Sequence, residues 1–327
     1  MELLDPTEAA ARIGATDTFG MPLGPRQPVA LLTQMGARDD WEELQVYGAL
    51  QTVFTDLFNN PNVHYLSGFF GPLDRALRDA GANVGFSPAD FRRFGPLLRD
   101  LAPRIMSTAA CPPDADGWCS LSLHAGASVD ELHLAGADPE RVLLVEVSPN
   151  FPQTIGLGDH RHAVHVDEID ILVESEAAPV TLADPPPSEI DRAIADHAAA
   201  FVPDGATLQT GIGAVPSVIA TLRAEGDGQG YGVHSEMFTD GLMRLHQAGK
   251  VTNQKGIYDG HSITTFAAGS TELYEWLDGN TEVCFLPVEH VNSPEVIGKN
   301  PKMMTINGAL AVDVHGQIVA DTIAGGQ

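Results

Sequence analysis

The stretch that decides the fold is ATLQTGIGAVPSVIATLRAEGDGQGYGVHSEM, residues 206–237. A short apolar run at its start precedes a glycine loop, and a second short run closes it. Between them we expect a helix from Ser217 to about Ala224, with Pro216 suited to its first turn, where backbone N–H groups have no helical partner. Strand, helix and strand in this order are typical of a βαβ unit in a parallel sheet.

The same alternation extends in both directions from this stretch. Apolar runs of strand length continue to alternate with segments of helical period, which predicts a largely parallel sheet covered by helices. The end of the chain reads as two strands around a turn at His315–Gly316. The helical segments are SEIDRAIADHAAAF (188–201), MFTDGLMRLHQAG (237–249) and STELYEWL (270–277), and the further strand-like runs are SITTFAAG (262–269) and EVCFLPVEHV (282–291).

The N-terminal half alternates in the same way, although less regularly. Three prolines in DPPP, residues 184–187, remove backbone donors and stiffen the chain, which favours a linker there. We therefore predict an α/β fold of two domains with mostly parallel open sheets, residues 1–184 and 188–327. The expected strands are 44–50, 62–69, 104–110 and 141–148, and the expected helices are 72–81, 89–101 and 127–137.

Composition and charge exclude several classes of protein. The chain has 44 acidic and 18 basic residues, a net charge of −26, so nucleic acid and anionic membrane surfaces are not expected partners. No apolar run reaches the roughly 18 residues that cross a bilayer, and no export signal is visible. Cys111, Cys119 and Cys284 are too few and too scattered for a disulfide framework. We expect a cytoplasmic protein that binds neither nucleic acid nor membrane.

The loop GIGAVP, Gly211–Pro216, is the first candidate site. Its glycines let backbone amides approach a ligand, and the N-terminus of the following helix adds a partial positive charge. A dinucleotide fingerprint would need a third glycine where Pro216 stands. Glu236 nevertheless falls near the distance of a ribose-binding acid, so a nicotinamide enzyme remains a competing interpretation. A tight structural turn is the other one.

Glu236 is the second candidate. It lies at the C-terminal end of a predicted strand, which is where open α/β sheets bind ligands. A glutamate at this place can act as a base or a nucleophile, or it can be a solvated loop acid. The residues alone leave these alternatives open.

Six motifs follow one another in the order found in a known protein family. They are GIGAVP (211–216), GVHSEM (232–237), VTNQK (251–255), FAAGSTELYEWL (266–277), EHVNSPEVIGKN (289–300) and MMTINGALAVDVHGQIVADTIAG (303–325). With them the chain resembles the acetyl-CoA hydrolase/transferase family, and within it the 4-hydroxybutyrate or butyrate CoA-transferase branch. LLVEVSPNFP (143–152) and HVDEIDILVE (165–174) add to the resemblance, which covers residues 100–327 well. Ser148 and Phe151 depart from the family pattern of asparagine and methionine.

The resemblance implies a chemistry. Glu236 matches the family's nucleophile, which attacks an acyl-CoA thioester and passes through an anhydride to a glutamyl-CoA thioester, in ping-pong exchange with a second carboxylate. It implies no metal and no tightly bound cofactor, since coenzyme A is a substrate. The implied partners are an acyl-CoA and a small carboxylic acid such as acetate, butyrate or 4-hydroxybutyrate, and a homodimer or higher homo-oligomer is expected.

The resemblance also implies roles for individual residues. Asn292 matches an asparagine that positions acyl oxygens, and a neutral amide can donate to an oxyanion without neutralising Glu236. Asn307 matches an asparagine that contacts CoA. Lys255 is a candidate for a CoA phosphate, with an ordinary surface lysine as the alternative. The implied CoA-binding loop consists of Gly211, Ile212, Gly213, Ala214 and Val215.

Two alternatives remain at this point, besides the nicotinamide enzyme. The same site could hydrolyse acyl-CoA by admitting water. Family members extend through a serine- and glycine-rich loop that completes the CoA site, and the present sequence ends at AGGQ, so a catalytically incomplete CoA-binding fragment is the second alternative.

Histidines and acids also cluster in residues 159–168, in a pattern that resembles a metal site. Their spacing fits a strand with alternating faces better, and we predict no metal.

Overall fold

The computed structural model describes residues 1–88, 90–124, 126–182, 186–211 and 213–320. The chain divides into two compact units. Unit 1 comprises Met1–Thr181, Leu277–Thr281 and Phe285–Glu289, and unit 2 comprises Leu182–Trp276, Glu282–Cys284 and His290–Gln327. Asp184 and Pro185 of the predicted linker lie outside the described residues, and the domain boundary there stays a prediction.

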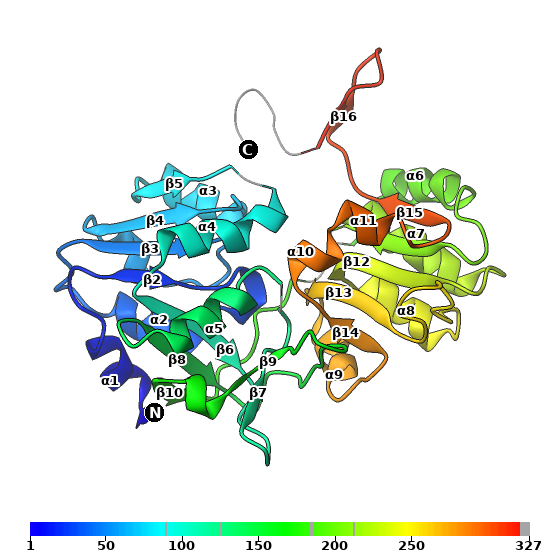
Figure 1. Ribbon diagram of the computed structural model, residues 1–327. Coiled ribbons are helices and arrows are strands. Elements are labelled where there is room, and N and C mark those ends of the chain that lie inside the picture. Colours follow the sequence, from blue (N-terminus) through cyan, green and yellow to red (C-terminus); the bar gives the residue numbers. More distant parts are fainter. Residues whose placement is uncertain (89, 125, 183–185, 212, 321–327) are drawn as a thin grey trace. The chain divides into compact units, whose positions relative to one another are not determined.

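Unit 1 is built on an eight-stranded sheet in which each described pairing is parallel (Figure 1). Its strand order is β1-β10-β8-β6-β2-β3-β4-β5. The four strands predicted in this half are present as β3, β4, β6 and β8. The bounds are β1 Glu2–Leu4, β2 Thr18–Gly20, β3 Leu44–Gly48, β4 Val63–Ser67, β5 Val84–Phe86, β6 Ile105–Ala110, β8 Val142–Val147 and β10 Ile171–Glu174.

Helices and a small hairpin complete unit 1. The three predicted helices are present, and the segment predicted at 89–101 divides into a 3-10 turn, η3, and the helix α4. The helices are α1 Pro6–Ala11, α2 Val29–Gly36, α3 Pro72–Asp79, α4 Phe94–Leu101 and α5 Val129–Ala137, the 3-10 turns are η1 Gly24–Arg26, η2 Asp56–Asn59, η3 Phe91–Arg93 and η4 Val166–Glu168, and the antiparallel hairpin is β7 Trp118–Ser120 with β9 Ala163–His165.

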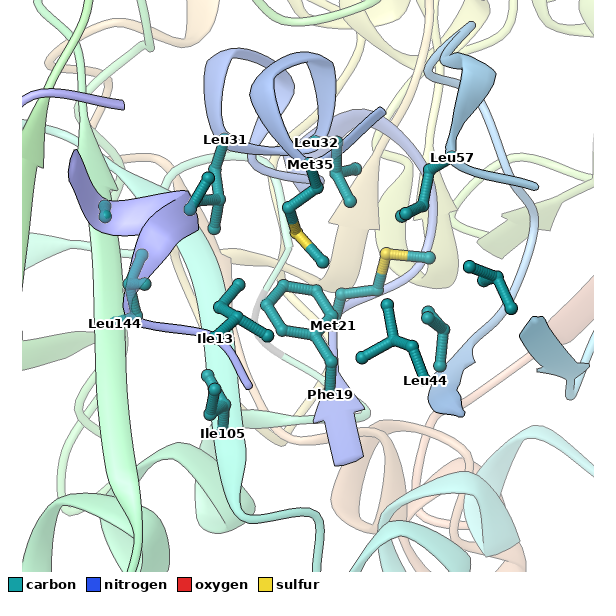
Figure 2. Packing of buried hydrophobic residues seen from close by; sticks show 14 of the residues in the cluster. Ile13, Phe19, Met21, Leu31, Leu32, Met35, Leu44, Leu57, Ile105 and Leu144 are labelled. Carbon is teal, nitrogen blue, oxygen red and sulfur yellow. The ribbon is translucent and has the colours of Figure 1, made fainter. Parts of the chain in front are cut away.

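The core of unit 1 has apolar side chains on both sides of the sheet. β8 reads VLLVEV, a nearly continuous apolar run, which is typical of a parallel strand covered on both faces. On one side, Met35 of α2 points toward Phe19 and Met21, and Leu31 of the same helix belongs to the same cluster (Figure 2). A second cluster includes Leu143 and Val145 of β8 and also Val288, from the late part of the chain.

Unit 2 contains a five-stranded sheet of order β14-β13-β12-β11-β15, and its described pairings are parallel (Figure 1). β11 and β12 are joined by α7, so the βαβ unit predicted from residues 206–237 is present and the α/β fold class is confirmed. The strands are β11 Thr207–Thr210, β12 Gly232–Phe238, β13 Ser262–Ala267, β14 Val283–Phe285 and β15 Met303–Ile306. The helices are α6 Glu189–Ala199, α7 Ala214–Glu225, α8 Asp240–Gln247, α9 Thr271–Leu277, whose last residue belongs to unit 1, and α11 Pro294–Ile297. Helix α10, Val288–Val291, begins with two residues of unit 1 and ends with two residues of unit 2.

Strand order in unit 2 reverses beside β11. After β11 the chain adds β12, β13 and β14 on one side, whereas β15 lies on the other side. In open α/β sheets, ligands bind outside the carboxyl ends of strands at such a reversal. Here the loop after β11 begins with Gly211, and Asn307 follows β15.

Beyond β15 the described chain ends in a small antiparallel hairpin, β16 Ala311–Val312 with β17 Ile318–Val319. It contains the predicted turn at His315–Gly316, and Gly316 has a positive φ of 82°. Across the described ranges, no helix has both the length and the apolar character needed to span a membrane.

Candidate active site

Glu236 lies near the end of β12, between buried neighbours. Ser235 and Met237 are buried, and the Ser235 hydroxyl donates to the Met237 carbonyl at 2.6 Å, which fixes the backbone around the glutamate. The Glu236 side chain itself is half-buried. Burial raises the pKa of its carboxyl group, while a hydrogen bond from Asn292 acts in the opposite direction. A carboxylate with a raised pKa is a better nucleophile or base than a solvated one.

Asn292 brings a neutral donor to this carboxylate. It directly follows α10, and its Nδ2 donates to Glu236 Oε2 at 2.5 Å. Within the described ranges, no lysine, arginine or histidine forms an ion pair with Glu236. The carboxylate therefore keeps its charge for chemistry, and its orientation comes from an amide.

Gly211, at the start of the glycine loop, lies against Asn307. Gly211 N donates to the Ile306 carbonyl at 2.9 Å, and a Cβ built on Gly211 would overlap the Asn307 side-chain oxygen. Gly213 has a φ of +126°, which favours glycine, and it caps α7. Ile212 lies outside the described residues.

Ala214 and Val215 are the first two residues of α7, which begins three residues before the predicted start at Ser217. The N–H groups of Ala214 and Val215 have no acceptor within the helix, so they can donate to an anionic ligand. This part of the loop can therefore serve as an anion site.

Two side-chain amides form reciprocal hydrogen bonds near the carboxyl ends of β11 and β15. Gln209 Nε2 donates to Asn307 Oδ1 at 3.1 Å, and Asn307 Nδ2 donates back to Gln209 Oε1 at 3.0 Å. Sequence reasoning missed Gln209, although its place one residue before the end of a strand beside the glycine loop is a readable signal. The pair holds Asn307 at the strand reversal.

A pocket of about 420 Å³ lies along α7, with lining residues from Ala214 at the start of the helix to Glu225 at its end. Arg192 of α6 and Arg244 of α8 are among its lining residues, together with Glu225. Arg244 also donates to the Thr221 hydroxyl at 3.1 Å. From the sequence, Lys255 was the one basic residue named as a candidate for a phosphate, and both arginines were missed. They supply local positive charge to a strongly acidic chain. The other lining residues are Pro186, Pro187, Ala214, Ser217, Val218, Thr221 and Leu222.

Lys255 is not brought to the glycine loop. Its side chain is 2% exposed, and Nζ donates to the carbonyls of Val233 at 3.0 Å and His261 at 2.5 Å. Burial lowers its pKa to about 8. A phosphate contact would require the ammonium to leave both carbonyls, so the predicted CoA contact finds no support in this position.

Burial of Lys255 predicts a pH-dependent stability. Between about pH 8 and 10.5 the unfolded lysine keeps its proton while the folded one loses it, so the unfolded state binds more protons and stability rises with pH. We expect this gain to be roughly 2–3 kcal/mol. Urea unfolding measures this gain as the difference in the free energy of unfolding between wild type and Lys255→Met across this pH range. The contributions of other titrating groups cancel in that difference. A difference that stays constant with pH would contradict the prediction.

The histidine-rich segment 159–168 directs its side chains to separate partners. His162 bonds through Nε2 to the Ser122 carbonyl at 2.6 Å, and His165 bonds through Nε2 to the Asp116 carbonyl at 3.0 Å. In the part of the chain that the structure describes, no three His, Cys, Asp or Glu residues gather as a metal site. The cysteines are buried as free thiols, and burial raises the pKa of Cys111 to about 12 and of Cys119 and Cys284 to about 11.

Comparison with known proteins places these features in a family context. Residues 269–327 match the model of the acetyl-CoA hydrolase/transferase C-terminal domain. A succinyl-CoA:cyclohexane-1-carboxylate CoA transferase of Geobacter metallireducens is 29% identical over 327 residues, 98% of this chain and 72% of that protein. A 4-hydroxybutyrate coenzyme A transferase of Clostridium kluyveri is 36% identical over 259 residues, 78% of this chain and 57% of that protein.

Solved structures agree with this similarity. RipA from Yersinia pestis superimposes with a TM-score of 0.90 at 28% identity, covering 100% of this chain and 76% of that one. A 4-hydroxybutyrate CoA-transferase from Porphyromonas gingivalis gives 0.78 at 23% identity, covering 97% and 75%, and supports the fold alone. The family resemblance drawn from the sequence motifs is confirmed.

Proposed function

We propose that this chain, which belongs to the acetyl-CoA hydrolase/transferase family, moves coenzyme A between a short-chain acyl-CoA and a free carboxylate, with Glu236 as the covalent nucleophile. The observation that carries the proposal is the half-buried Glu236 carboxylate, which accepts a hydrogen bond from neutral Asn292 and has no cationic partner within the described ranges. The Geobacter and Clostridium relatives are named as CoA transferases, which supports CoA transfer in general.

The first half-reaction moves CoA onto the protein. A Glu236 oxygen attacks the thioester carbonyl, the C–S bond breaks, and an acyl–glutamyl anhydride forms with release of CoA thiolate. The thiolate then attacks the glutamyl carbonyl and the acyl group leaves as its carboxylate. The product is a glutamyl-CoA thioester, and no electrons are gained or lost.

In the second half-reaction another carboxylate attacks the glutamyl-CoA thioester, and CoA thiolate is released as the mixed anhydride forms. The thiolate then attacks the new acyl carbonyl, which gives the new acyl-CoA and restores the Glu236 carboxylate. Each attack on a carbonyl forms an oxyanion, which a hydrogen-bond donor stabilises. The bond from Asn292 to Glu236 Oε2 supports the assignment of Asn292 as the donor when the glutamyl carbonyl is attacked. Because the amide carries no charge, it supports the oxyanion without holding the resting carboxylate too tightly.

CoA enters this scheme as a substrate. Its phosphates would meet the N–H groups at the start of α7, and Arg192 and Arg244 would add positive charge in the pocket along the same helix. Gly211 and Asn307 define the shape of the loop, and Lys255 is not part of this site. The proposed acyl groups are of the acetate, butyrate or 4-hydroxybutyrate type. Assembly as a homodimer or larger oligomer stays a prediction, to be measured by light scattering.

The test is turnover with and without an acceptor. Butyryl-CoA plus acetate should yield acetyl-CoA and butyrate with no net release of free thiol, because CoA is exchanged between acyl groups. Rapid thiol release without acetate would instead identify a hydrolase. CoA binding without either product would identify a CoA-binding protein. Stabilisation by NAD that equals or exceeds that by CoA would favour a dinucleotide protein.

Gly211→Ala tests the CoA loop. The added methyl group displaces the Asn307 side chain, and overpacking of this kind costs about 1–3 kcal/mol. If CoA needs the undisturbed loop, its dissociation constant should rise about tenfold, which corresponds to 1.4 kcal/mol. Calorimetric titration with CoA measures the change. Gly308→Ala is the matched control, since a Cβ added there would have no other atom within 4 Å; equal affinity in all three proteins would exclude the loop from CoA binding.

A further inference from the structure

His234 lies on β12 two residues before Glu236, so both side chains leave the strand on the same face. It is 1% exposed. Its Nε2 lies 2.7 Å from the carbonyl oxygen of Val291. That carbonyl belongs to the residue directly before Asn292, the donor to Glu236.

The histidine is a neutral donor with one available tautomer. Burial lowers its pKa to about 4, so the ring carries no charge near pH 7. A carbonyl oxygen only accepts hydrogen bonds, so Nε2 must carry the proton and Nδ1 must be bare. Nδ1 is buried and has no hydrogen-bond partner among the described residues. The ring therefore makes one directed bond, to the Val291 carbonyl.

That bond acts on the peptide unit from which Asn292 begins. The Val291 oxygen and the Asn292 Cα lie in one planar peptide group, so holding the oxygen restricts the position of that Cα. The preceding helix, α10, has only 4 residues and gains little stability from its own hydrogen bonds. A second contact holds the same segment, since the Tyr258 hydroxyl bonds to the His290 ring.

We propose that His234 is a positioning residue for the transfer reaction: it holds the Val291–Asn292 peptide so that the Asn292 amide meets the Glu236 carboxylate. The inference rests on the proposed function. β12 then carries both the nucleophile, Glu236, and His234, which lies about 6.6 Å away along the strand. His234 holds the peptide of Asn292, the residue that donates to Glu236. A displacement of about 1 Å at reacting groups can cost 10²-fold in rate.

Three variants test the role. His234→Phe keeps a buried ring but removes the donor, and kcat should fall 10- to 100-fold with KM for acyl-CoA unchanged. His234→Gln places an amide N–H near the position of Nε2, and most of the loss should be recovered. His162→Phe is the matched control, because His162 is also buried and neutral and bonds through Nε2 to a backbone carbonyl, that of Ser122. It should lose stability but keep kcat.

A double-mutant cycle separates positioning from general structural damage. If His234 acts through Asn292, then His234→Phe should lower kcat less than threefold in an Asn292→Ala background, although it lowers kcat strongly in the wild type. Fully additive losses would overturn the proposal, as would a wild-type kcat in His234→Phe. An equal kcat loss in His162→Phe would also overturn it. Should His234→Phe fail to fold, His234→Asn replaces it, because its amide is too short to reach the carbonyl.

A readout independent of turnover distinguishes this inference from the proposed function. The side-chain amide of Asn292 gives a ¹H–¹⁵N signal, identified by its loss in Asn292→Ala. In His234→Phe this signal should move toward the shift of a free amide, and in His234→Gln it should stay near the wild-type position. A wild-type protein with no transfer activity refutes the proposed function, whereas an unmoved signal in His234→Phe refutes the role of His234.

Discussion

Replacing Glu236 by glutamine is expected to lower kcat for CoA transfer by about 10⁴-fold or more, because removal of a covalent nucleophile has effects of this size. Glutamine keeps the size of the side chain but cannot form the anhydride. Wild-type protein incubated with acyl-CoA alone should gain the mass of CoA, and Glu236→Gln should not. Mass spectrometry of the intact protein checks both. Borohydride should reduce the trapped thioester at residue 236 and fix its position in a peptide map.

Glu236→Asp should also fail, although the carboxylate remains. Shortening the side chain by one methylene moves the attacking oxygen by more than about 1 Å, enough to cost about 10²-fold, and it withdraws the oxygen from Asn292. Replacement of Cys111, Cys119 or Cys284 by alanine is the control. Their raised pKa values keep these thiols protonated at neutral pH. A CoA adduct on a cysteine, or full turnover by Glu236→Gln, would refute the mechanism.

Asn292→Ala is expected to lower kcat by about 10²–10³-fold, the usual effect of losing one oxyanion donor. It should also change the pH profile. Catalysis needs ionised Glu236, whose pKa is raised by burial and lowered by the bond from Asn292. Loss of that bond raises the pKa further, so the rate should begin to fall at a higher pH as the solution is acidified.

The pH profile of kcat, measured for wild type and Asn292→Ala, checks this shift. Asn300→Ala is the matched control, because the Asn300 amide is buried and donates to the carbonyls of Val296 at 3.1 Å and Ile297 at 3.3 Å, with no bond to Glu236. It should reduce stability and leave the profile in place. An acid limb that does not move in Asn292→Ala would show that the amide does not act on the nucleophile.

The parts of the fold that were predictable are those set by local pattern. Residues 206–237 carry both strand runs and the helix of one βαβ unit, and the structure has all three as β11, α7 and β12. The first forty residues were not resolved into elements from the sequence. β1 pairs with β10, Glu2 beside Ile171, and such a distant pairing leaves no periodic signal near either strand.

For the candidate site too, the features set by local pattern were predictable and those set by distant contacts were not. Glu236 was identifiable from its place at a strand end and from family motifs. The contact of Asn292 with Glu236 joins residues 56 apart in the chain, so only the resemblance pointed to Asn292. The burial of Lys255 could not be predicted, because a lysine is ordinarily exposed and its burial follows from packing that no local pattern encodes. His234 was visible in the HSEM motif, but its role depends on where Val291 lies.

The interrupted path of the chain has a consequence for synthesis in the cell. Unit 1 includes residues up to Glu289, and Val288 is fully buried in one of its apolar clusters. A nascent chain leaves the ribosome from its N-terminus, and domains generally fold in that order. Unit 1 cannot complete its core until residue 289 has emerged, by which time β11, β12 and β13 of unit 2 have been made. The two units must therefore finish folding over the same period of translation, and a fragment cut after Thr181 would lack part of its own interior.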